Sequence, residues 1–131
     1  MIELFELGIS EETINNMVEL FPEIKDMSEN KILEKVTILK KLGCSENQII
    51  NIIGSNPEYL TKSNKVILEL ISKLVDLGFR NLNILFDGNP YVLNFEAFEI
   101  DNYVNNRIKN GELLEDIVDD LDSNPYLFSE V

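Results

Sequence analysis

Histidine is absent from this chain of 131 residues, and cysteine occurs once, which removes most side-chain chemistry. A nucleophile has no imidazole base, an internal disulfide has no second thiol, and a Cys/His zinc site lacks ligands. The paired acids at Glu11–Glu12 and Asp119–Asp120 have no basic counterpart beside them, and residues 119–125 lack the ligand spacing of a calcium loop. We expect no catalytic residue, metal or cofactor, and a buried Cys44.

Basic side chains are the remaining candidates for chemistry, as contacts to a partner. The formal net charge is −13, and the acidic excess lies in residues 1–27 and 111–131, whereas residues 28–110 hold equal numbers of acids and bases. Eight bases of the balanced segment fall in predicted long helices, and five of them are our candidate partner-binding residues: Lys31, Lys35, Lys65, Lys73 and Arg107. An acidic surface disfavours binding to phosphate backbones, although it does not exclude it.

Two independent sets of residues recur along the chain at intervals of 33 or 35 residues. The prolines are Pro22, Pro57, Pro90 and Pro125, and the glycines are Gly8, Gly43, Gly78 and Gly111. An interval near 34 residues is typical of solenoids built from two-helix repeats. We therefore predict one helical-repeat domain over residues 1–131, with repeats at about 1–27, 28–62, 63–94 and 95–131.

Apolar residues keep fixed distances from these markers. Eight residues before each proline stand Ile14, Ile49, Leu82 and Ile117, and four before stand Val18, Ile53, Phe86 and Leu121. Seven residues before each glycine stand Met1, Val36, Ile71 and Val104. Each repeat should thus have a short helix that ends before the proline, a tight turn, and a long helix that a glycine ends at positive φ. The prediction is an all-α solenoid of about four units with incomplete ends.

The repeats also differ in detail. The third is two residues shorter between its glycine and its proline, so its short helix should be clipped at the start. Ser10 and Ser45 stand where they can cap the short helices of the first two repeats, and Gln48 would complete a capping box. Because the basic residues share no register between repeats, a code of one base read per repeat is not indicated.

The repeated pattern resembles the mTERF repeat of the mitochondrial transcription termination factor family. The copies are LGISEETINNMVELFPEI (7–24), LGCSENQIINIIGSNPEYL (42–60), LGFRNLNILFDGNPYVL (77–93) and NGELLEDIVDDLDSNPYLF (110–128). The resemblance implies superhelices of helix–helix–3₁₀ units, many of which bind nucleic acid in mitochondria or chloroplasts. The segment LGF at 77–79 also resembles the loop of ubiquitin-associated domains, but the fourfold spacing argues against that alternative.

We expect a non-catalytic binding module that docks a macromolecular partner, a protein in preference to nucleic acid; the alternative is an mTERF-like nucleic-acid-binding regulator of transcription or RNA processing. The balanced middle and acidic ends favour a protein partner, whereas nucleic acid is favoured by the resemblance alone.

The first ten residues hold two acids and no base, unlike a secretory signal or an organelle presequence, so we expect a cytoplasmic location. The frequent use of Lys and Asn favours a bacterial source. Apolar residues at 126–128 should fold back on the last repeat or pair two chains, as a monomer or a weak homodimer.

Overall fold

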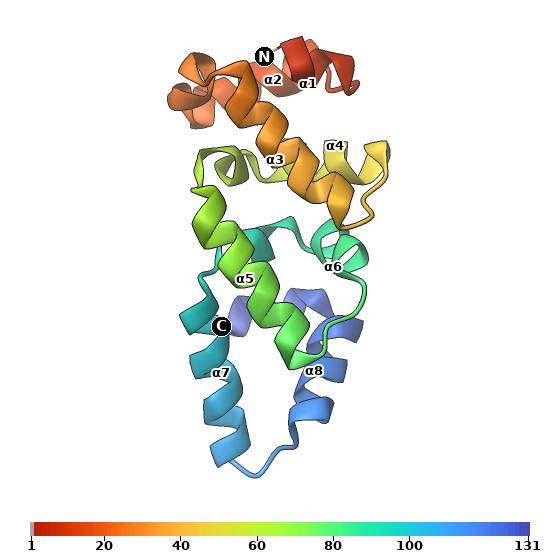
Figure 1. Ribbon diagram of the computed structural model, residues 1–131, viewed down its shortest axis with the longest axis vertical. Coiled ribbons are helices and arrows are strands. Elements are labelled where there is room, and N and C mark those ends of the chain that lie inside the picture. The colour runs from red at the N-terminus through yellow and green to blue at the C-terminus, as the bar shows by residue number, and fades with distance from the viewer. Residues whose placement is uncertain (1) are drawn as a thin grey trace. The chain divides into compact units, whose positions relative to one another are not determined.

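The computed structural model describes residues 2–131 of the chain, and side-chain surroundings from Leu4 onward. Over these residues it consists of helices and contains no strand (Figure 1). The α-helices are α1 (Ile2–Glu6), α2 (Glu11–Leu20), α3 (Glu29–Lys41), α4 (Glu46–Ser55), α5 (Asn64–Leu77), α6 (Leu82–Gly88), α7 (Ala97–Lys109) and α8 (Leu114–Ser123). The 3₁₀ helices are η1 (Pro22–Asp26), η2 (Pro57–Thr61), η3 (Pro90–Asn94) and η4 (Pro125–Glu130). None of the described helices has the length and apolar character needed to cross a bilayer.

The described chain divides into two compact units, the first ending at Asn64 and the second running from Lys65 to Val131. Within the second unit, α7 and α8 are consecutive and form a helical hairpin (Figure 1). The prediction of one domain over residues 1–131 stays a prediction.

The order of elements follows the predicted repeat of long helix, short helix and 3₁₀ helix. Each of the four prolines is the first residue of a 3₁₀ helix, and the residue before it leaves the helical region, as at Asn56 with φ −134° and ψ 71°. Pro cannot donate to the helix behind it and restricts the preceding residue, so it ends the short helix and starts the turn. This part of the fold prediction is confirmed.

Each long helix ends at one of the four recurring glycines, all of which have positive φ, between 91° and 109°. The residue after each glycine donates its backbone N–H to the carbonyl of the residue four before that glycine. These bonds are Ile9 to Leu4 (3.1 Å), Cys44 to Leu39 (3.1 Å), Phe79 to Leu74 (3.0 Å) and Glu112 to Arg107 (3.2 Å). The pattern is the Schellman motif, which satisfies a terminal carbonyl and brings the two bonded residues together.

Serine caps start the helices of the first unit. Ser10 accepts from the Thr13 N–H (3.2 Å), and Ser45 and Gln48 form the predicted capping box at 2.9 and 3.2 Å. In the third repeat α6 has 7 residues where α2, α4 and α8 each have 10, and its N-cap Asn81 makes no side-chain cap bond. The predicted shortening of the third repeat is therefore confirmed, because α6 begins closer to its proline than α4 does to its own.

Most of the apolar residues at the registers predicted for the core are buried. Ile14, Ile49, Leu82 and Ile117 are all buried. Val36 and Val104 are buried and Ile71 is half-buried, while Met1, assigned to the same column, lies outside the described residues. The third residue after each of the last three prolines is also buried: Leu60, Leu93 and Phe128. Cys44 is buried as expected, directly after the glycine that ends α3.

Candidate functional site

A groove in the first unit contains two of the five predicted binding residues, Lys31 and Lys35. It has a volume of about 790 Å³ and lies between η1, the start of α3 and the segment from Leu60 to Asn64. The charged residues in its lining are Glu23, Asp26, Lys31, Glu34, Lys35 and Lys62. Because acids and bases line it in equal number, the groove suits a ligand that carries both charges better than a polyanion.

Lys35 is part of the wall of this groove. It is only 4% exposed, and its Nζ donates to Oδ1 of Asn64, whose Nδ2 donates to Oε2 of Glu34 at 2.7 Å. Burial lowers the pKa of Lys35, and the charge of Glu34 opposes that shift. The buried Tyr59 hydroxyl donates to the Lys35 carbonyl at 2.7 Å, and burial raises the pKa of that phenol. Lys31, in contrast, is exposed at the rim.

The other three predicted binding residues lie in the second unit, each beside an acid. Lys65 Nζ is 4.0 Å from Glu69 on the exposed side of α5. Lys73 Nζ lies 3.2 Å from Asp101 and so links α5 to α7. Each of these three bases therefore lies near an acid of its own unit, and the role of the five bases as partner contacts stays a prediction.

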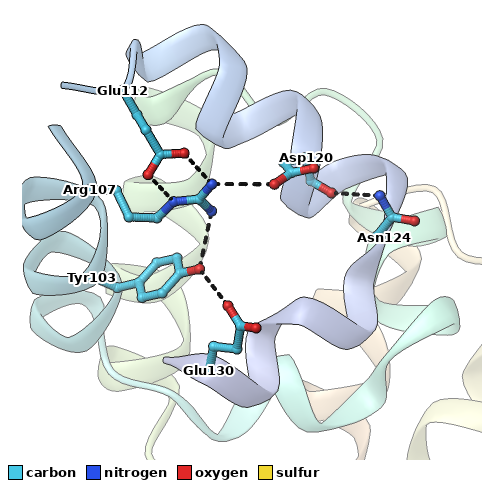
Figure 2. Close-up of polar contacts among 6 residues, drawn as sticks. All are labelled: Tyr103, Arg107, Glu112, Asp120, Asn124 and Glu130. Atoms are coloured by element: carbon cyan, nitrogen blue, oxygen red, sulfur yellow. Dashed lines mark hydrogen bonds and ion pairs between the residues drawn. The ribbon is translucent and has the colours of Figure 1, made fainter. Parts of the chain in front are cut away.

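Arg107 is the centre of a polar network between α7, α8 and η4 (Figure 2). Its Nε and Nη2 donate to the two carboxylate oxygens of Glu112, the former at 2.7 Å, and Nη2 also reaches Oδ2 of Asp120 at 3.3 Å. Its Nη1 donates to the Tyr103 hydroxyl at 3.1 Å, and that hydroxyl donates to Glu130 at 3.3 Å. The guanidinium also lies 5.5 Å from the centre of the Tyr103 ring.

The electrostatics of this network hold both main partners in their charged forms. The hydrogen bonds to Glu112 raise the pKa of Arg107, and the same bonds lower the pKa of Glu112. A bidentate arginine–carboxylate pair fixes orientation as well as charge. Such a pair with further acceptors around it is a rigid polar surface and not a proton-transfer site, because neither group titrates near neutral pH.

Arg107 was predicted from its position in a long helix, but the network around it was not predicted. Tyr103, Glu112, Asp120 and Glu130 were not among the predicted site residues. The available signal was the register: four residues before Gly8, Gly43 and Gly78 the chain has Leu4, Leu39 and Leu74, all fully buried, and before Gly111 it has Arg107. An arginine at a register that is otherwise buried leucine predicts local polar partners.

Replacement of Glu112 by Gln should lower stability at neutral pH and lose that effect in acid. The pKa of Glu112 is lowered in the folded state, so its ionised form stabilises the fold above its ordinary pKa of about 4.3. That contribution disappears as the pH falls through the lowered value, where Arg107 faces a protonated acid, with Asp120 and Tyr103 beside it. The measurement is urea unfolding of both proteins from pH 7 to pH 3.

The matched control is Asp119→Asn, which removes an exposed acid from α8, the helix that follows Glu112. It should not show the same dependence on pH. A Glu112→Gln effect that is equal at pH 7 and pH 3 would contradict the ion pair as its source.

Comparison with known proteins agrees with this architecture. The family model of mTERF matches residues 2–87, and the chain therefore belongs to the mTERF family. The matched range runs from α1 into α6, so the Arg107 network lies outside it. No curated protein matches the chain significantly.

Proposed function

We propose that this mTERF-family chain is a non-catalytic helical-repeat module that docks a protein partner. The observation that carries the proposal is the pairing of its bases within the chain. Lys35 is buried on Asn64, Lys73 is paired with Asp101, and Arg107 is held by two acids. A protein partner does not require a continuous row of unpaired cations, whereas a phosphate backbone does.

The groove of the first unit is the proposed docking surface. Its volume of about 790 Å³ lies in the range of pockets that accept side chains or small ligands. Lys31 is exposed at its rim, Lys62 is half-buried, and Glu23 and Asp26 are exposed acids from η1. This alternation of charge fits a polypeptide segment that carries both acidic and basic side chains.

Nucleic-acid binding is the second candidate function, and membership of the mTERF family favours it. Against it stand the net charge of −13 and the mixed lining of the groove. Binding along a phosphate backbone would have to compete with the ion pairs of Lys73 and Arg107. The two functions differ in their response to salt, because each neutralised phosphate releases counterions.

The chain should not bind random duplex or single-stranded oligonucleotides at physiological salt. Fluorescence anisotropy with labelled oligonucleotides over a salt series measures this directly. A micromolar or tighter complex that weakens steeply with salt, and is lost in Lys31→Glu/Lys65→Glu/Lys73→Glu, would establish nucleic-acid binding and reverse the proposal. Lys35 is left unchanged in this variant because its burial would make loss of binding indistinguishable from unfolding.

The protein-docking function is tested by affinity capture from nuclease-treated lysate. Capture should be lost in the groove variant Lys31→Glu/Lys62→Glu and retained in Lys41→Glu/Lys109→Glu, which makes the same charge change on exposed bases outside the groove. Equal capture by both variants would place the binding surface elsewhere and contradict the groove. Capture that needs intact nucleic acid would support the second function.

A further inference from the structure

Three registers that are buried and apolar in the first three repeats are charged in the last repeat. Four residues before the glycine, Leu4, Leu39 and Leu74 correspond to Arg107. One residue after the glycine, Ile9, Cys44 and Phe79 correspond to Glu112. Five residues before the proline, Met17, Ile52 and Leu85 correspond to Asp120. The three replacements contact one another, since Arg107 binds both acids.

The first two registers are the two ends of the Schellman bond. In the third repeat the N–H of Phe79 binds the carbonyl of Leu74, and both side chains are buried, at the two positions where an apolar contact usually accompanies this motif. In the last repeat the same backbone bond joins Glu112 to Arg107, and the side chains form an ion pair in place of the apolar contact. The backbone hydrogen bond is thus the same in both repeats, and the two side chains at its ends change together from apolar to charged.

The same registers of the third repeat face the repeat that follows. The Phe79 ring lies 6.0 Å from the ring of Phe128 in η4, and α6, which carries Leu85, packs against η4. Asn89 donates to the Pro125 carbonyl at 3.0 Å beside this contact. By repeat equivalence, Glu112 and Asp120 lie on the face on which a next unit would pack.

The last repeat leaves this face accessible to water. The side chains of Arg107, Glu112 and Asp120 are 20%, 40% and 48% exposed, whereas their counterparts in the other repeats are at most 8% exposed. A unit stacked on them would have to desolvate an arginine and two carboxylates, which costs more than their mutual attraction returns unless every group is satisfied.

We propose that Arg107, Glu112 and Asp120 form a capping surface that excludes a second copy of this chain from packing on the fourth repeat. The occupant that is excluded is specific: an apolar surface of the kind that η4 presents to Phe79. The function of the network is therefore to keep the protein from associating end to end, independently of what the groove binds.

The test restores the residues of the third repeat at the three registers. Arg107→Leu/Glu112→Phe/Asp120→Leu should retain the helical circular dichroism of the wild type but self-associate. Sedimentation velocity over a concentration series should show at least a doubling of the average mass, while the wild type keeps the mass of one chain. Exposed apolar patches of this kind drive association.

The control Arg107→Gln/Glu112→Gln/Asp120→Asn removes the charges without adding apolar surface and should sediment as one chain. If the triple apolar variant does not fold, Arg107→Leu/Glu112→Phe replaces it, since this variant restores only the two residues of the Schellman bond. It should also self-associate in sedimentation velocity. A folded apolar variant that stays at the mass of one chain, a control that associates equally, or a wild type that associates would each overturn the proposal.

Discussion

Ile53→Asp is expected to unfold the protein. Ile53 is fully buried in α4, four residues before the proline that ends this helix. Loss of a buried isoleucine side chain costs about 2–5 kcal/mol, and burial of an unpaired carboxylate adds several kcal/mol more. Since the total stability of a small domain is about 5–15 kcal/mol, the variant should show little helical circular dichroism at 25 °C.

Glu46→Lys is the matched control on the same helix. Glu46 is exposed in the first turn, where loss of its favourable interaction with the helix dipole costs at most about 1 kcal/mol. Equal shifts of the melting temperature in the two variants would contradict the assignment of Ile53 to the core. Ile53→Asp also tests the single-domain prediction, because helical signal retained by residues 65–131 would show that the two units unfold separately.

Phe128→Ala is expected to lower the free energy of unfolding by about 3–5 kcal/mol. The ring is fully buried in the second unit, 6.0 Å from the Phe79 ring and 6.4 Å from the Phe95 ring. Of the apolar residues at 126–128, Phe128 is buried within the chain and Tyr126 is exposed. The pairing of two chains through this segment stays a prediction. Urea unfolding monitored by circular dichroism measures the loss.

Tyr126→Ala serves as the control for Phe128→Ala. Tyr126 lies in the same 3₁₀ helix but is 67% exposed, so its removal should change the free energy of unfolding by less than about 1 kcal/mol. A comparable loss from both variants would indicate that η4 is stabilised as a whole and not through the aromatic contacts of Phe128.

Much of the fold follows from residues whose effect is local. A proline ends a helix and a glycine permits positive φ wherever they stand, so the positions of Pro57 and Gly43 predict turns without knowledge of the rest of the chain. The buried registers can be predicted because an amphipathic helix buries its apolar face, and the same apolar registers recur in all four repeats. Fold class, repeat order and the shortened α6 are therefore all visible in the sequence.

The candidate sites were less predictable because they depend on side-chain pairs that are distant in sequence. An amphipathic pattern assigns Lys35 to solvent, and only the approach of Asn64, 29 residues later, accounts for its burial. The acid that binds Lys73 is on another helix, Asp101. The exception is Glu112, because the other three repeats have Ile9, Cys44 and Phe79 at its register, so its departure from an apolar pattern was a usable signal.

Because Cys44 is buried, the rate at which its thiol is alkylated measures local opening of the structure around it. This cysteine is the only one in the chain, it is 8% exposed, and its N–H closes the end of α3. An alkylating reagent therefore reaches the sulfur mainly when the junction between α3 and α4 opens. The ratio of labelling rates in the native and the denatured chain gives the free energy of that opening. Compared with the free energy of global unfolding, this value tells whether the second repeat opens alone or only with its neighbours, without any engineered probe.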